Sequence, residues 1–145
     1  MPRVTRIVSI DAPNDKVIDY ISNVENHPAF ISALKSVDNI NGDYKKPGTS
    51  WDWTFVMSGV ELKGKAKTQN YEPGKVYSFK TDGSINSTFT YSVEPEDSGT
   101  RLSIDVDYEI PKNVLGKVVD AAVIERLNEQ EAEQGGNNLK AILEG

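Results

Sequence analysis

Residues that could perform acid–base or metal chemistry are few in this chain. It has 145 residues, no Cys and a single His, His27. These counts exclude thiolate catalysis, Cys-ligated metals and clusters of His ligands, so we expect no metal site and no cofactor. The formal net charge of −6 argues against nucleic acid as the main partner, because phosphate binding needs concentrated Lys and Arg.

His27 stands directly before Pro28, in a segment that interrupts a short helix. We expect His27 to cap a helix end or to lie at the surface. The alternative is that it lines the mouth of a pocket between the short helices and a sheet. A general acid or base role there would need a partner that the sequence does not reveal.

The other candidates for acid–base chemistry are Tyr and Glu side chains. Tyr91 and Tyr108 fall on apolar strand faces, where a hydroxyl could polarise or protonate a carbonyl group. Glu125 and Glu129 lie in the polar centre of a predicted C-terminal helix, and Arg6 could point inward from the first strand. The inward hydroxyls are not ready general bases at neutral pH, and the sequence does not show whether the charged groups face a pocket, so it assigns no catalytic residue.

The elements that must position these groups are mainly strands. Residues 49–111 predict five successive β-strands, each apolar on one face and polar on the other. The clearest is residues 51–57, where alternate positions carry two Trp, a Phe and a Met. A two-residue hairpin loop at Ser58–Gly59 pairs Met57 with Val60, so the apolar rows of two strands share one side.

Two further turns set the facing of the later strands. Pro73–Gly74 suits a type II turn that pairs Glu72 with Lys75 and brings the aromatic residues of the next strand to the same side. A three-residue loop at residues 82–84, with its Gly in the left-handed conformation, keeps the apolar residues of 85–93 inside. A two-residue loop would instead bury the polar residues that alternate with them in this strand.

The inward rows give the predicted ligand-binding residues. They are rich in aromatic rings and either fill a solid core or wall a cavity. Their polar members are mostly hydroxyls and amides, among them Thr68, Asn70, and Ser78 or Tyr77 depending on register. The predicted ligand-binding set is Trp51, Trp53, Phe55, Met57, Tyr77, Phe79, Ser87, Phe89, Tyr91 and Tyr108.

The N-terminal part predicts a strand followed by short helices. Residues 3–10 are rich in β-formers, and the segment after Asp11 opens a helix with one apolar face. Pro28 starts a second short helix, and residues 35–41 form a further strand.

The C-terminal part, residues 114–144, predicts one long helix. Gly135–Gly136 interrupts its helix-forming composition. Either the helix frays or kinks there, or the paired Gly let its backbone pass close to the sheet or a ligand.

Length and composition indicate one domain over residues 1–145. No run approaches the roughly 20 apolar residues of a membrane span, so we expect no stable membrane insertion. The N-terminus lacks the layout of a signal peptide, and a cytoplasmic location is the default expectation.

Several turn and cap motifs carry a resemblance to a known superfamily. They are Ala12–Ser22, Asn26–Pro28, Pro47–Thr49, Tyr71–Gly74 and Gly99–Leu102. Together with the order of elements, they resemble the START-like helix-grip superfamily (SRPBCC), and within it the polyketide cyclase/dehydrase and coenzyme Q-binding-like proteins. The resemblance implies an α+β fold: a seven-stranded curved antiparallel sheet, with two short helices after the first strand, wrapped around a long C-terminal helix.

Members of that superfamily bind lipids, sterols, quinones, polyketides or plant hormones between sheet and final helix, and some catalyse cyclisation or dehydration there. Fold alone does not separate carrier from enzyme. The leading hypothesis is therefore binding or transport of a hydrophobic small molecule. One alternative is an aromatase/cyclase or dehydratase that uses Tyr91, Tyr108 or a helix Glu. The other is an accessory interaction protein whose cavity is filled.

Overall fold

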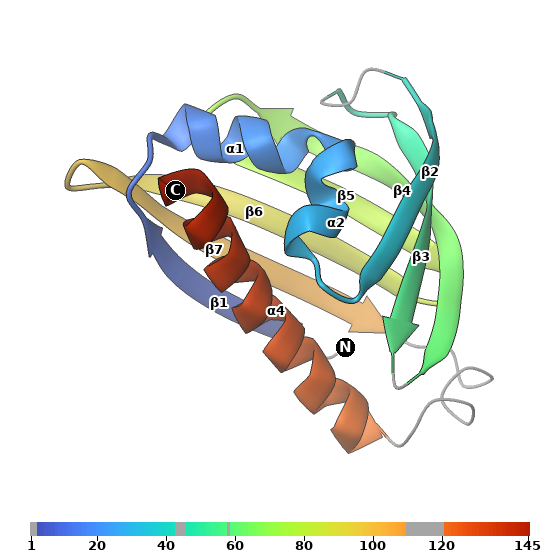
Figure 1. Ribbon diagram of the computed structural model, residues 1–145. Helices are drawn as coiled ribbons and strands as arrows, with labels where there is room; N and C mark the ends of the chain where they lie inside the picture. The colour runs from blue at the N-terminus through green and yellow to red at the C-terminus, as the bar shows by residue number, and fades with distance from the viewer. Residues whose placement is uncertain (1–2, 43–45, 58, 110–120) are drawn as a thin grey trace.

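The computed structural model describes residues 3–42, 46–57, 59–109 and 121–145, and its main feature is a curved antiparallel sheet (Figure 1). Seven strands follow the spatial order β1-β7-β6-β5-β4-β3-β2, and every neighbouring pair is antiparallel. Their bounds are β1 (Arg3–Ile10), β2 (Leu34–Asn41), β3 (Ser50–Met57), β4 (Val60–Glu72), β5 (Val76–Gly83), β6 (Asn86–Glu96) and β7 (Gly99–Glu109).

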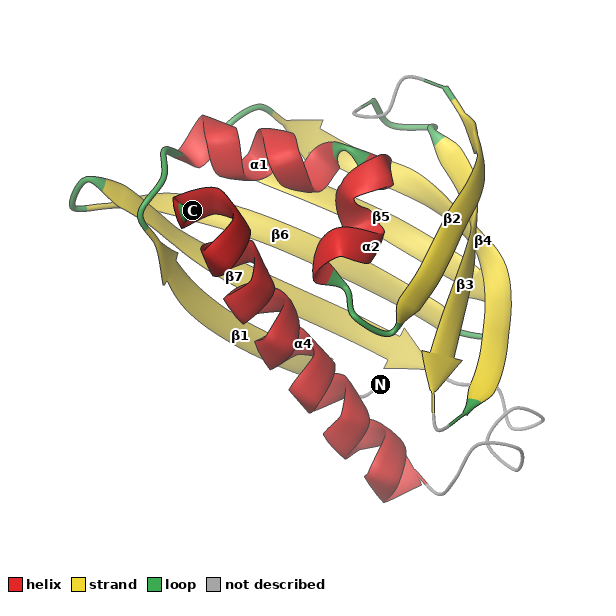
Figure 2. Cartoon of the chain, viewed as in Figure 1, coloured by secondary structure: helices red, strands yellow, loops and turns green. Residues whose placement is uncertain are grey.

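The helices lie on the concave face of this sheet (Figure 2). Two α-helices and a 3₁₀ turn follow β1, and the last helix crosses the sheet near β1 and β7. Their bounds are α1 (Asn14–Ser22), η1 (Val24–Asn26), α2 (His27–Phe30) and α4 (Ala121–Glu144). The predicted α+β helix-grip architecture is confirmed. None of the helices in the described ranges is long and apolar enough to cross a membrane.

The hairpin between β3 and β4 has the predicted register. Met57 pairs with Val60 across a turn in which Gly59 has a φ of +78°, and Trp53 pairs with Gly64. Trp51 and Trp53 are buried on the concave side. Because side chains alternate along a strand, the Lys residues of β4 face the other side and are exposed.

The turn between β4 and β5 differs from the prediction by one residue. Lys75 donates its backbone N–H to the Glu72 carbonyl at 3.0 Å, as a type II turn requires, but Glu72 pairs with Val76 in the ladder. A β-bulge between Thr68 and Asn70 compensates for this shift and restores the expected facing beyond it. The bulge also turns Asn70 outward, so the prediction of an inward Asn70 is wrong.

The turn between β5 and β6 is longer than predicted, but the same side chains of β6 point inward. Gly83 is left-handed with a φ of +103°, as expected, but the first ladder pair is Thr81 with Ser87. A loop over residues 82–84 would pair Thr81 with Ile85. Because the observed pairing differs by two positions, and facing repeats every two residues, the same side chains stay inside.

The two edge strands of the sheet are β1 and β2. β2 pairs irregularly with β3, with register shifts between Leu34 and Ser36 and between Asp38 and Asn41. Asn39 has a φ of +53° in this segment. At the other edge, Lys140 of α4 donates from Nζ to the Ser9 carbonyl of β1 at 2.8 Å.

The described part of the last helix is continuous through Gly135 and Gly136, both of which are buried. A Cβ placed on Gly136 would lie 3.5 Å from the Val8 side chain of β1 and 3.7 Å from Ile104 of β7. The paired Gly therefore mark a close approach of helix to sheet, as one of the two alternatives predicted. The predicted helical residues 114–120 lie outside the described residues.

Candidate ligand-binding site

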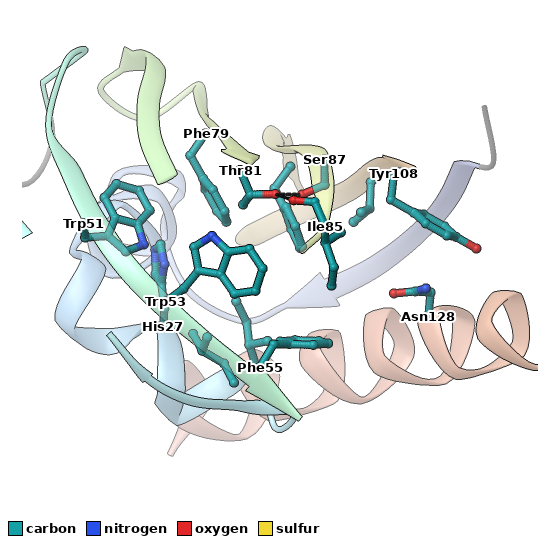
Figure 3. A pocket seen from close by; sticks show the side chains of 14 residues that line it. His27, Trp51, Trp53, Phe55, Phe79, Thr81, Ile85, Ser87, Tyr108 and Asn128 are labelled. Carbon is teal, nitrogen blue, oxygen red and sulfur yellow. Dashed lines mark hydrogen bonds between the residues drawn. The ribbon is translucent and has the colours of Figure 1, made fainter. Parts of the chain in front are cut away.

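A small apolar cavity of about 60 Å³ lies between the concave face of the sheet, α2 and α4 (Figure 3). β3, β5, β6 and β7 supply most of its wall, and α4 supplies Asn128. No residue in the described lining carries a charge at neutral pH. The lining residues are His27, Ile31, Leu34, Trp51, Trp53, Phe55, Phe79, Thr81, Ile85, Ser87, Phe89, Val106, Tyr108 and Asn128.

Seven of the ten predicted ligand-binding residues line this cavity: Trp51, Trp53, Phe55, Phe79, Ser87, Phe89 and Tyr108. Tyr91 instead lines a second hollow next to it. Tyr77 is fully buried and lines neither of the two hollows, because it packs edge-on against His27 at a ring-centroid distance of 6.0 Å. Met57 lies in β3, but its side chain falls outside the described residues.

His27 stands at a helix end, as expected, because it is the C-cap of η1 and the first residue of α2. The surface position is wrong: the side chain is 1% exposed and lines the cavity, as the alternative predicted. Its Nε2 lies 2.9 Å from the Ile21 carbonyl oxygen, and its ring stacks on Phe79 at a centroid distance of 5.2 Å. The His27 ring also makes an edge contact with Trp51, at a ring-centroid distance of 5.7 Å, and so lies within an aromatic cluster.

Burial lowers the pKa of His27 to about 4, although its hydrogen bond to the Ile21 carbonyl opposes this change. The imidazole is therefore neutral at physiological pH. A carbonyl oxygen can only accept a hydrogen bond, so the proton sits on Nε2 and Nδ1 keeps its lone pair. His27 presents an aromatic face and an acceptor nitrogen, with no positive charge.

Stacked rings form the floor of the cavity. Phe79 and Phe89 face each other across β5 and β6 at a centroid distance of 4.7 Å and an interplanar angle of 8°. Trp51 meets Phe79 at 5.5 Å. Such a wall favours flat apolar molecules, which gain dispersion contacts over their whole face.

Tyr108 stands at the opposite end of the cavity from Trp51, beside Asn128 of α4 (Figure 3). Its hydroxyl is buried and makes no hydrogen bond of ordinary geometry with the part of the chain that is described. Burial raises the pKa of Tyr108, the Asn128 amide opposes this, and the carboxylates of Glu125 and Glu129 raise it further. The hydroxyl therefore stays protonated at neutral pH.

The charged candidates from the sequence lie away from the cavity. Glu125 and Glu129 are exposed on α4. Arg6 does lie on the helix side of β1, but its guanidinium meets Glu129 at 4.0 Å and does not line the cavity. Burial raises the pKa of Tyr91 well above its ordinary value, so this hydroxyl is not a base.

A second hollow of about 40 Å³ adjoins the first beneath α4. Ile31, Phe55, Phe89, Val106 and Asn128 line both hollows. Pockets for drug-sized ligands usually measure about 300–1,000 Å³. The cavity is thus much smaller than the predicted lipid, quinone or polyketide ligands require.

Several lining residues could have been found from the sequence. Thr81, Ile85 and Val106 occupy inward positions of rows that alternation already defined. Asn128 lies three residues after Glu125, on the polar centre of the helix. For His27 the sequence offered the pocket only as an alternative, because its burial depends on how α2 docks on the sheet.

Comparison with known families decides which group of proteins this architecture represents. Residues 1–144 match the family described as polyketide cyclase / dehydrase and lipid transport. The chain belongs to this family. No curated protein matches the chain.

Solved structures with the same fold support the family's START-like architecture. A Thermus thermophilus protein matches with a TM-score of 0.81 and 18% identity, over 97% of this chain and 95% of that one. The Zhui aromatase/cyclase of a Streptomyces species matches with a TM-score of 0.80 and 14% identity, over 98% and 93%. A START superfamily protein of Mycobacterium smegmatis matches with a TM-score of 0.79 and 14% identity, over 99% and 98%.

Proposed function

We propose that this family member binds or carries a hydrophobic small molecule, held between the concave face of the sheet and α4. The observation that carries the proposal is the uncharged, ring-lined cavity in which both Trp residues of the chain take part. Apolar walls with a few hydroxyls are typical of small-molecule sites. A cytoplasmic location is part of the proposal.

Even a single-ring ligand requires the cavity to widen, because about 60 Å³ is well below the roughly 150 Å³ of a cavity that holds benzene. Phe55 is only partly buried and lines both hollows, so rotation of its side chain would join them. We expect binding to begin with this rotation and to end with Phe55 packed against the ligand. A Phe55→Ala variant then binds two-ring compounds more tightly than the parent chain does, because the partition between the hollows is gone.

The decisive experiment is native mass spectrometry with solvent extraction of protein purified from its source. It is supported by titration of Trp fluorescence with apolar ligands, for which Trp51 and Trp53 are the internal reporters. A retained compound and a saturable response support the proposal. No retained compound, and no saturable response in either the parent chain or Phe55→Ala, would refute it. Val56→Ala, at the next position on β3, is the matched control.

The small cavity favours a second candidate, an accessory interaction protein whose interior is filled. About 60 Å³ holds only a few water molecules. This candidate predicts that Phe55→Ala is destabilised but gains no affinity for apolar compounds. A protein partner recovered with the parent chain, at a defined ratio and without any small molecule, would support it.

An aromatase/cyclase or dehydratase activity is the remaining alternative. In the described cavity lining, acid–base chemistry would depend on the Tyr108 hydroxyl, because His27 is neutral and no carboxylate is present. Turnover of a poly-β-keto substrate that is lost in Tyr108→Phe would support this alternative. Equal turnover in both chains would remove Tyr108 from that role.

A further inference from the structure

Two hydroxyls form the polar spot nearest the stacked rings of the cavity. Thr81 of β5 and Ser87 of β6 stand directly opposite each other in the ladder. Their hydroxyls are joined by a short hydrogen bond, drawn as a dashed line in Figure 3, and both residues line the cavity. Ser87 is buried, with 6% of its surface exposed.

The direction of this hydrogen bond follows from a neighbouring one. Thr81 Oγ1 also lies 3.0 Å from the Ile85 carbonyl oxygen, which can only accept. The single hydrogen of Thr81 is therefore donated to Ile85. Thr81 then accepts the hydrogen of Ser87, and Ser87 Oγ keeps lone pairs that no described residue fills.

The other described polar groups around the rings also have no free hydrogen-bond donor to offer a ligand. Trp53 donates its indole N–H to the Lys65 carbonyl at 3.0 Å, so this donor is already used. His27 donates through Nε2 and retains a lone pair on Nδ1. The Tyr108 hydroxyl lies at the far end of the cavity, near Asn128, and is directed away from the Thr81–Ser87 pair (Figure 3).

We propose that the cavity selects neutral aromatic molecules that carry a phenolic or enolic hydroxyl, which donates its hydrogen to Ser87 Oγ while the ring packs on Phe79 and Phe89. This inference depends on the proposed function and specifies the ligand class of the same site. Anionic ligands such as carboxylates are disfavoured, because the described lining offers no cation and its free polar atoms near the rings are acceptors. Ethers and ketones are disfavoured because they bring a second acceptor to Ser87.

The test uses single-ring probes of matched size on the full chain, measured by isothermal titration calorimetry. Phenol carries the donor, anisole and acetophenone carry only acceptors, and benzoate carries a charge. We expect phenol to bind about fivefold more tightly than anisole, as one neutral hydrogen bond provides. Benzoate should give no saturable binding.

Two variants test whether Ser87 accepts the hydrogen bond from the ligand or donates it. Ser87→Ala removes the acceptor and should bring the ratio of phenol to anisole affinity close to 1. Thr81→Val removes the partner that takes the Ser87 hydrogen, so Ser87 becomes a donor and acetophenone should gain affinity relative to phenol. Thr90→Val, on the opposite face of β6, is the matched control and should keep the parent preference.

The outcomes separate this inference from the proposed function. Equal binding of phenol and anisole to the parent chain, or a phenol preference that survives Ser87→Ala, overturns the inference while leaving an apolar site intact. Binding of none of the neutral probes, to either the parent chain or Thr81→Val, counts against the proposed function itself. Circular dichroism melting curves of each variant confirm that the fold is retained.

Discussion

At the residue scale, His27 shows how the fold changes the chemistry of a side chain. Its ring lies among Phe30, Trp51, Tyr77 and Phe79, and its one hydrogen bond in the described structure goes to a backbone carbonyl. In this setting a positive charge has no solvent and no carboxylate partner to stabilise it. Protonation of His27 is therefore less favourable in the folded chain than in the unfolded chain, and the free energy of unfolding depends on pH.

This gives a pH dependence with a defined sign. The pKa of His27 is about 4 in the folded chain and 6.5 when unperturbed. Its contribution is fully present above pH 6.5 and is lost as pH falls toward 4, because the unfolded state binds the proton first. The loss is roughly 3 kcal/mol.

Urea unfolding of the parent chain and of His27→Phe between pH 4 and pH 7.5 measures this term. Between pH 7.5 and pH 4 the free energy of unfolding of the parent chain should fall by roughly 3 kcal/mol more than that of His27→Phe, since the carboxylate contributions are common to both proteins. Curves that stay parallel over the whole range would show that His27 is accessible to protons in the folded state.

Gly64 is a second residue whose type is fixed by its surroundings. A Cβ at this position would lie 1.9 Å from the Asp82 carbonyl oxygen and 2.5 Å from the Trp53 ring. Gly64→Ala must therefore shift the backbone at the contact with β5 and also displace the Trp53 ring. We expect a destabilisation of about 1–3 kcal/mol, as for other overpacked sites, together with a changed Trp emission spectrum.

Thermal unfolding followed by fluorescence tests this prediction. Gly59→Ala is the comparison variant, because a Cβ there meets nothing within 4 Å and its cost comes only from the positive φ. If Gly64→Ala were the milder of the two, the close packing of Trp53 on β4 would be disproved.

At the scale of elements, α4 is positioned by contacts along its length. The Glu131 carboxylate accepts hydrogen bonds of 2.7 Å from both the Ala33 backbone N–H and the Ser32 hydroxyl. Asn138 donates from its amide to the Phe30 carbonyl at 3.2 Å. Glu131, in the polar middle of the helix, therefore anchors α4 to the segment between α2 and β2, and Asn138 anchors it to α2.

The close approach at Gly136 leaves room for one methyl group. Its nearest neighbours would be side-chain atoms of Val8 and Ile104 at ordinary van der Waals distances. Gly136→Ala should therefore stabilise the protein by about 0.5–1 kcal/mol, because Ala loses less backbone entropy in a helix. Chemical denaturation of the two chains measures the difference, and a destabilisation of similar size would mean that helix and sheet are closer than described.

Strand facing was predictable because it depends only on a period of two residues and on where turns fall. The rows containing Trp51 and Trp53, and Leu102 to Tyr108, needed no knowledge of the tertiary structure. Ladder pairing was less predictable: the bulge at Thr68 and Asn70 has no clear sequence signal, and it changed the facing of Asn70. The volume of the cavity was beyond prediction, since it depends on how side chains such as Phe55 settle.

At the scale of the whole molecule, ligand binding and folding are linked. A ligand that binds only the folded state at about 100 times its Kd adds about 2.7 kcal/mol of stability. For a chain of this size, that corresponds to a Tm increase of about 5–11 °C.

Removing the natural ligand by solvent extraction should therefore lower the Tm of protein from its source. Adding back the extract should restore the original value. Identical melting curves before and after extraction would indicate that the native protein carries no bound compound.

The irregular pairing of β2 has a consequence for how this protein behaves at high concentration. An open sheet leaves two rows of unpaired backbone groups, and a long regular edge would invite a second molecule to add its own strand. The shifts in β2 and the left-handed Asn39 distort one row, while Lys140 occupies a carbonyl of the other. Both edges are therefore poor templates for the addition of a strand from a second molecule.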